Sequence, residues 1–244
     1  MELPNSLIVE PLTRETRLSE VRRSKGWRHP LAAFAKRISL KEICAEVLQS
    51  QTLLSRVAAS SYRHSNGFDK IIIWRDESDA LIKLDVWWEG DTDWGLIHNH
   101  RFDFSSYVLK GSLQLRHYLA AKPTEDNAVD VYQLSFRQRP EELVPTRKGM
   151  LLTWEGTMPA DGYYDMECNM FHQATGTAGT VTVTLVVQGG ARRPYSEIVS
   201  DTPFVVETAD MAAVEETPSA ARRVRLNRFT EQEVTSKLER LAEL

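Results

Sequence analysis

Residues 68–90 read FDKIIIWRDESDALIKLDVWWEG. At this point in the chain the spacing of the apolar residues changes. In residues 82–86 apolar and charged side chains alternate, and a period of two is typical of a β-strand with two unlike faces. The segment RDES between the two apolar runs is a turn signal. These residues therefore predict two strands joined by a turn, rather than the helices that the preceding sequence predicts.

The same pattern continues toward the C-terminus as far as residue 190. Further predicted strands are GLIHNHRF, FSSYVLKG, SLQLRHYLA, AVDVYQLSF, GMLLTWEG, GYYDMECNMFHQA and TVTVTLVVQGG. Short turn signals such as KG, MPADG and TGTAG separate them. Many short strands joined by tight turns predict a mostly β, antiparallel sandwich or barrel over residues 68–190.

Residues 1–67 are predicted to form a helical segment packed on this barrel, with residues 27–62 mostly helical. HPLAAFAKRI has Pro30 where a first helical turn accepts proline, and the next segment opens with the capping-box pair Ser39 and Glu42. Its apolar residues recur at helical spacing, so one face is expected to be buried. Residues 191–244 are predicted to be an extension in which DTPFVVETADMAAVEETPSAARR is a surface loop. The extension ends in a helix capped by Thr230.

Composition narrows the class of protein. The chain has 244 residues, 42% of them apolar and 26% charged, which is typical of a globular domain with attachments. Two cysteines without a CxxC pair, no signal-peptide pattern and no apolar run of about 20 residues predict a cytoplasmic protein without a membrane span. The net charge of −4 gives no general attraction to nucleic acid or to anionic membranes.

Two of the six histidines stand two places apart in GLIHNHRFDF, residues 95–104. On a strand, His98 and His100 share a face with Leu96 and Phe102, so this is expected to be the buried side. Two buried imidazoles are costly unless each is hydrogen-bonded or coordinated. Neutral imidazole is a common ligand for zinc, iron, copper and nickel. A metal site is therefore the favoured interpretation, and a hydrogen-bonded pair of core histidines is the alternative.

With a later histidine before a hairpin turn, this arrangement resembles the cupin superfamily over residues 68–190. The first cupin motif is matched by Gly95, His98, His100 and Gly111, and the second, more loosely, by Pro159, Gly162 and His172. The resemblance implies a double-stranded antiparallel β-barrel, or jelly roll. It also implies a metal held by His98, His100 and His172.

The chain departs from the family at one ligand. With six intervening residues before Gly111, Phe104 stands where the family has a glutamate, so the resemblance implies three histidines alone. Three-histidine cupins include the thiol dioxygenases, but their His-x-Tyr pair on the last strand is replaced here by Val186 and Gln188. Asp103 is expected to join the site only if its strand bulges.

The other candidate residues lie on strands whose faces the sequence does not assign. Gln114, Arg116 and Tyr118 share one face, and Arg116 would bind a substrate carboxylate if that face is internal. An exposed arginine on an outer sheet is the alternative. Lys83 and Asp85 are further candidates for substrate binding. His117 is expected to be a core residue, and Cys168 to be a small buried side chain rather than a reactive thiol.

The function that these features favour is a metal-dependent oxygenase or dioxygenase acting on a small polar molecule. Three neutral ligands leave positions open on Fe(II) for substrate and dioxygen. The alternatives are a zinc enzyme catalysing a non-oxidative rearrangement or isomerisation, and a module that binds a ligand without catalysis. Manganese and nickel are further candidate metals. The expected partners are the small-molecule substrate and a second copy of the chain in a homodimer.

Overall fold

The computed structural model describes residues 28–78, 80–134, 144–202, 204–207, 222–225 and 227–244. The helices are α2 (Arg28–Ala35), α3 (Leu40–Gln49), α4 (Gln51–Ser60) and α5 (Glu231–Ala242). Of the helical segment predicted for residues 1–67, residues 1–27 lie outside the described residues, and the helices predicted from there to residue 62 and at the C-terminus are confirmed. The expected capping box of Ser39 with Glu42 is present at α3, and Thr230, the expected cap of the terminal helix α5, forms a capping box with Glu233.

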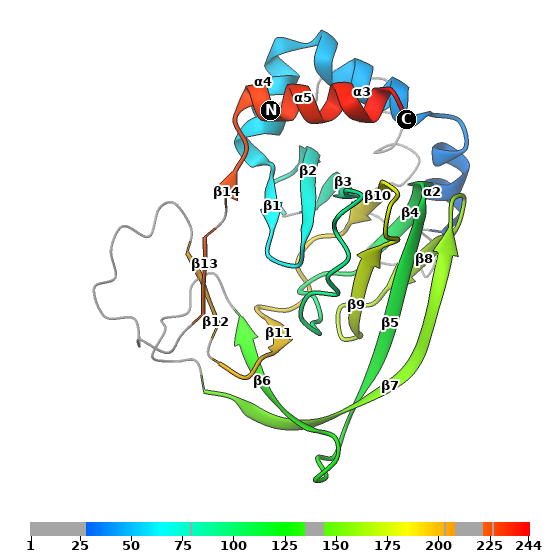
Figure 1. Ribbon diagram of the computed structural model, residues 1–244. Helices are drawn as coiled ribbons and strands as arrows, with labels where there is room; N and C mark the ends of the chain where they lie inside the picture. The colour runs from blue at the N-terminus through cyan, green and yellow to red at the C-terminus, as the bar shows by residue number, and fades with distance from the viewer. Residues whose placement is uncertain (1–27, 79, 135–143, 203, 208–221, 226) are drawn as a thin grey trace.

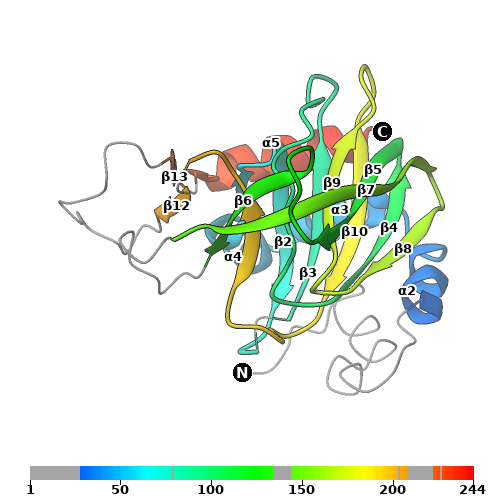
Figure 2. The ribbon, with the colours of Figure 1, turned by 90° about the horizontal axis from the view of Figure 1, so that it is seen from below.

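Two antiparallel sheets form the body of the molecule (Figure 1). The seven-stranded sheet has the order β14 (Asn227–Arg228), β1 (Tyr62–His64), β2 (Phe68–Arg75), β3 (Leu81–Trp87), β10 (Thr182–Gln188), β4 (Phe104–Lys110) and β8 (Tyr163–Met166). The five-stranded sheet has the order β11 (Ser196–Val199), β6 (Ala128–Leu134), β7 (Thr146–Pro159), β5 (Ser112–Ala121) and β9 (Phe171–Gly176). Figure 2 shows β6 and β7 running across β2, β3 and β10. The mostly β, antiparallel double-sheet architecture predicted from the sequence is confirmed.

The outer face of the seven-stranded sheet carries the main apolar core. Ile71 of β2 and Leu84 of β3 pack in one cluster with Val47 of α3 and Leu238 of α5, and all four are buried. The inner face of the same sheet turns toward the five-stranded sheet. All seven residues of β3 are buried, because helices cover one face and the second sheet covers the other. Lys83 and Asp85 are therefore internal residues although they are charged.

The strands extend beyond the predicted range. β11 joins the five-stranded sheet, and β1 and β14 join the other, although all three lie outside residues 68–190. The prediction of a loop over DTPFVVETADMAAVEETPSAARR is wrong in part, because β12 (Phe204–Glu207) and β13 (Arg222–Arg225) form a two-stranded parallel sheet. Backbone pairing with a distant segment decides both strands, and local sequence does not reveal it. Residues 208–221 of that stretch lie outside the described residues.

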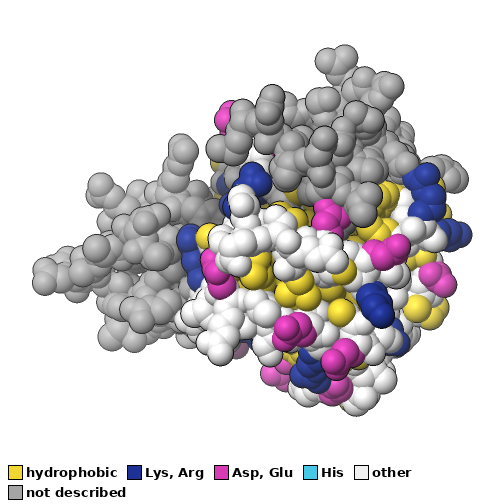
Figure 3. Space-filling model, turned by 90° about the horizontal axis from the view of Figure 1, so that it is seen from above, with side chains coloured by type: hydrophobic (Ala, Val, Ile, Leu, Met, Phe, Trp, Pro, Cys, Tyr) yellow, Lys and Arg dark blue, Asp and Glu magenta, His cyan; other side chains and the backbone are white. Residues whose placement is uncertain are grey.

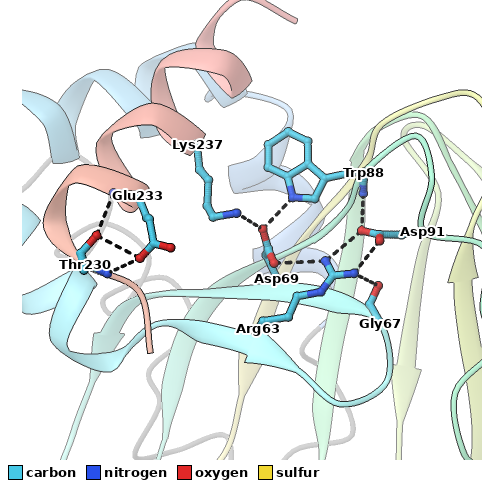
Figure 4. Close-up of polar contacts among 8 residues, drawn as sticks. All are labelled: Arg63, Gly67, Asp69, Trp88, Asp91, Thr230, Glu233 and Lys237. Carbon is cyan, nitrogen blue, oxygen red and sulfur yellow. Dashed lines mark hydrogen bonds and ion pairs between the residues drawn. The ribbon is translucent and has the colours of Figure 1, made fainter. Parts of the chain in front are cut away.

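A buried carboxylate fastens α5 to the sheet (Figure 4). Asp69 of β2 is 1% exposed and accepts hydrogen bonds from Trp88 Nε1 at 2.6 Å and Lys237 Nζ of α5 at 2.7 Å. Arg63 Nη1 donates to the same carboxylate at 3.1 Å and also binds Asp91. Over the helical end of the molecule, acidic and basic side chains are interspersed with apolar ones (Figure 3).

Candidate metal centre

The backbone brings the two histidine segments together. His98 N donates to His172 O at 3.1 Å, and His172 N donates to His98 O at 2.9 Å. On its other side the same segment pairs with β11, where Asn99 N donates to Glu197 O at 3.0 Å. The predicted strand GLIHNHRF is thus a short extended segment held between β9 and β11, with isolated bridges at His98.

Three imidazoles converge at this point. One ring nitrogen of each of His98, His100 and His172 lies within 4.8 Å of the other two. His100 Nε2 and His172 Nε2 are 2.8 Å apart. Two ring nitrogens at this distance repel each other through their lone pairs unless a proton or a cation lies between them. The donor set and its spacing therefore suit a metal ion held by three histidines.

The orientation of His98 is fixed by the chain just before it. His98 Nδ1 lies 2.9 Å from Leu96 O, and a carbonyl oxygen only accepts, so Nδ1 carries the hydrogen and Nε2 keeps its lone pair for a ligand role. Gly95 has φ +65°, and a Cβ there would lie 2.7 Å from Asn66 Cβ. Glycine is required in this loop for both reasons. His172 Nδ1, in contrast, is buried without a hydrogen-bond partner among the described residues.

Burial keeps all three imidazoles neutral. It lowers the pKa of His98 to about 4, and the positive charges of Lys70 and Lys83 act in the same direction. Burial lowers the pKa of His100 and of His172 well below the usual histidine value, and neighbouring imidazoles add to the effect. The neutral form predominates at neutral pH, and it is the form that binds metals.

Phe104, which the sequence frame places at the position of the family's glutamate, forms an apolar boundary beside the imidazoles. The Phe104 ring lies 5.0 Å from that of His100 and 6.1 Å from that of His172, between ring centroids. Phe104 is buried against Met166 and Val186. No carboxylate of the described residues belongs to the ligand group.

Asp103 and Cys168 have partners of their own beside the centre. Asp103 Oδ1 accepts from Cys168 N at 2.8 Å, and its other oxygen forms an ion pair with Arg192. Asp103 is accordingly engaged away from the histidines. Burial and the neighbouring Asp103 carboxylate raise the pKa of the half-buried Cys168 thiol, so this cysteine is protonated at neutral pH.

The face of β5 that carries Gln114, Arg116 and Tyr118 is the outer one, away from the internal Leu113 and Leu115. Arg116 forms an ion pair with Glu155 and lies 3.9 Å from the centroid of the Trp94 ring. Tyr118 OH donates to Gln173 Oε1 at 2.5 Å, and Gln173 Nε2 donates to Gly95 O at 2.7 Å. The structure does not bring these three predicted residues together with the histidines, and two of them support the loop before His98.

Lys83 and Asp85, the other predicted pair, lie on the inner face of β3. Lys83 Nζ donates to Asp85 Oδ2, and both residues are 6% exposed. Val186, the neighbour of Lys83 across the sheet, packs against Phe104. The pair is therefore next to the apolar boundary of the metal centre. Lys70 lies opposite Asp85 on β2 and was missed, although the alternation in FDKIIIWRD places it on one face with Phe68.

Comparison with known sequences does not identify a family for this chain. No protein-family model matches the chain, and no curated protein is similar enough to count as a relative. Among solved structures, the cupin domain of Schizosaccharomyces pombe Cnp3 aligns with 50% of this chain and 64% of its own, at 8% identity and a TM-score of 0.30. A structure of the DMSP lyases RdDddP and RnDddQII aligns over 51% and 48%, at 15% identity and a TM-score of 0.31. Oxalate oxidase with the substrate analogue glycolate aligns over 55% of each chain, at 13% identity and a TM-score of 0.33.

These alignments span about half of the chain. Two antiparallel sheets give the double-sheet architecture that the resemblance to cupins implies, and the His-x-His segment together with the third histidine on β9 forms a three-histidine group that could hold a metal ion. In the described part of the chain, no helix is both long and apolar enough to cross a membrane.

Proposed function

We propose that the chain is a mononuclear metal enzyme in which His98, His100 and His172 hold Fe(II), and that it uses dioxygen to oxidise a small polar molecule. The observation that carries this proposal is the convergence of three neutral imidazoles. Among the described residues, no carboxylate belongs to this ligand group. Fe(II) with three neutral nitrogen ligands retains its full positive charge and has positions open for substrate and dioxygen.

The surrounding residues support this chemistry through the environment that they provide. Phe102 and Phe104 lie 5.2 and 5.0 Å from the His100 ring, between centroids, and form an apolar boundary. Such a boundary excludes water and favours an apolar molecule such as dioxygen over a charged ligand. The Leu96 carbonyl holds His98 in one tautomer, so its ligating nitrogen is prepared before a metal arrives.

A zinc enzyme catalysing a non-oxidative rearrangement is the second candidate, and one observation favours it. Burial lowers the pKa of Lys83 to about 8, although the Asp85 carboxylate opposes the shift. A lysine with a pKa near neutrality can accept and return a proton, which is the step that an isomerisation requires. Zinc also suits three imidazole ligands with an open fourth position.

The test is reconstitution under exclusion of oxygen, separately with Fe(II) and with Zn(II), followed by a screen of small acids, amino acids and amines. The oxygenase proposal predicts substrate-dependent oxygen uptake with iron and none with zinc, and no uptake by a His100→Ala variant. Turnover with zinc in the absence of oxygen would refute the oxygenase proposal and support the isomerase proposal. Ligand binding without turnover under either metal would make the chain a binding module.

A further inference from the structure

A charged group lies inside the molecule, next to the metal centre. Lys83 and Asp85 of β3 form a buried ion pair, and Lys70 of β2 lies directly opposite Asp85 in the antiparallel register. Lys70 Nζ is 5.3 Å from the centroid of the Tyr62 ring, and Lys83 Nζ is 5.8 Å from that of Phe68. Lys83 is buried, whereas Lys70, Tyr62 and Phe68 are half-buried, so the second ammonium group lies at the edge of the interior.

The charges of this group do not balance. Two lysines, the buried Lys83 and the half-buried Lys70, face one carboxylate, and the neighbouring histidines are neutral, so the group carries one positive charge more than Asp85 offsets. A metal ion held by three neutral ligands would add to that excess. Buried charge is costly unless it is paired, and a protein that keeps such an excess at a site commonly pairs it with an anionic ligand.

Two polar atoms beside Lys83 are open to a ligand. Asp85 Oδ1 is buried without a hydrogen bond among the described residues, and Ser106 Oγ, which lies near the Tyr164 side chain across the strand pair, makes no hydrogen bond of normal geometry. Val186 of β10 pairs with Lys83 of β3 on one side and with Ser106 of β4 on the other. Lys83 and Ser106 therefore lie on the same face of the sheet. A hydroxyl can donate to a ligand oxygen, and a carboxylate oxygen can accept from a ligand hydroxyl or amine. These atoms would match a molecule that carries an acid group and a donor.

We propose that Lys83, assisted by Lys70 and Ser106, binds the carboxylate of a small hydroxy or amino acid, which is the substrate of the metal centre. Asp85 holds the Lys83 ammonium in place and accepts a hydrogen bond from the donor group of the same molecule. The inference rests on the proposed function for the role of the metal, whereas the binding of the carboxylate rests on the lysines alone. In agreement, the Lys83 charge contributes to lowering the pKa of all three histidines, which places it within electrostatic reach of each.

The experiment measures the binding of lactate and, as its uncharged counterpart, lactamide, by calorimetry on zinc-loaded and on metal-free protein. The informative variant is Lys83→Met combined with Asp85→Leu, because removing Lys83 alone leaves a buried carboxylate unpaired and threatens the fold. Lys83→Gln serves as a second variant if the double variant does not fold, and Asp85→Asn keeps the lysine. Arg147→Met, which removes only an exposed ion pair with Asp130, is the matched control.

Lactate is expected to bind the wild type in preference to lactamide, and about 10- to 100-fold more weakly to the double variant or to Lys83→Gln. Asp85→Asn and Arg147→Met should retain the preference for the acid. Equal affinity for acid and amide in the wild type, or undiminished lactate binding without Lys83, would overturn the proposal. A lack of oxygen uptake with iron, together with Lys83-dependent lactate binding, would instead reject only the oxygenase.

Discussion

At the scale of single residues, two reciprocal backbone hydrogen bonds between His98 and His172 assemble the centre. They align the segment that contains His98 and His100 with β9, which carries His172. The three imidazoles therefore project to the same side. The Leu96 carbonyl then selects the His98 tautomer. Because the backbone does the positioning, removing the His100 imidazole should affect metal binding far more than it affects the fold.

Replacing His100 by alanine is therefore expected to abolish most metal binding while the chain remains folded. The expected result is loss of the metal in elemental analysis and an unchanged far-ultraviolet circular dichroism spectrum. His117→Gln is the matched control, because His117 lies on β5 outside the three-histidine group. Equal metal content in wild type and His100→Ala would show that the three histidines are not the metal site.

The sequence predicts part of this centre for a physical reason. The spacing of His98 and His100 places them on one face of any extended segment, and the frame from Gly95 to Gly111 points to a cupin-type site. The side of the sheet on which Arg116 and Lys83 lie could not be predicted. Both strands alternate polar and apolar residues, and only the positions of the helices and of the second sheet decide which face is internal.

At the scale of elements, turns with positive φ values define where strands begin and end. Gly111 between β4 and β5 has φ +72°, and a Cβ there would meet Val181 O at 2.4 Å. Gly179, before β10, has φ +75° but no atom within 4 Å of its Cβ position. Both glycines have a positive φ, but only Gly111 is closely packed. Comparing substitutions at the two positions therefore separates the energetic effect of backbone conformation from that of close packing.

Gly111→Ala is expected to destabilise the protein by clearly more than Gly179→Ala. The second substitution should cost about 1 kcal/mol, which is the penalty of the left-handed conformation alone. The first adds a clash with a backbone oxygen that has little freedom to move. Urea unfolding of both variants gives the comparison, and similar midpoints would mean that the sheet relaxes around residue 111.

The network around Asp69 is the corresponding feature for α5. Asp69→Asn removes the charge from hydrogen bonds to Arg63 and Lys237, and we expect a loss of about 2–3 kcal/mol in the free energy of unfolding. Asp130→Asn is the control, because its ion pair with the exposed Arg147 should contribute less than about 1 kcal/mol. A loss of equal size in both variants would argue against a special role for the buried carboxylate.

At the scale of the whole molecule, helices and sheets enclose an interior that is partly polar. The change of period near residue 68, the capping boxes and the terminal helix follow from local sequence, and the structure confirms them. The addition of β11 to one sheet and of β1 and β14 to the other could not be predicted. These strands are two to four residues long, and β11 and β14 pair with strands from far along the chain, whereas β1 pairs both with the adjacent β2 and with β14.

The burial of several neutral histidines makes the folded chain less stable in acid. Burial lowers the pKa of His98 to about 4, and it also lowers the pKa of His64, which is stacked on Phe68, below the usual histidine value. Between pH 4 and the unperturbed histidine pKa of about 6.5, the unfolded chain binds more protons than the folded chain. The stability contributed by the neutral imidazoles is therefore fully present above pH 6.5 and is lost as the pH falls toward 4.

We accordingly expect the midpoint of urea unfolding of the metal-free protein to fall as the pH is lowered from 6.5 to 4. A His64→Phe variant, which keeps an aromatic ring against Phe68, should show a shallower decline because one buried imidazole no longer has to be protonated. Saturation with zinc should raise the midpoint most at pH 6.5 and less at lower pH, since protons compete with the metal for the histidines. A midpoint that stays constant or rises on acidification would show that the imidazoles are not held neutral by the fold.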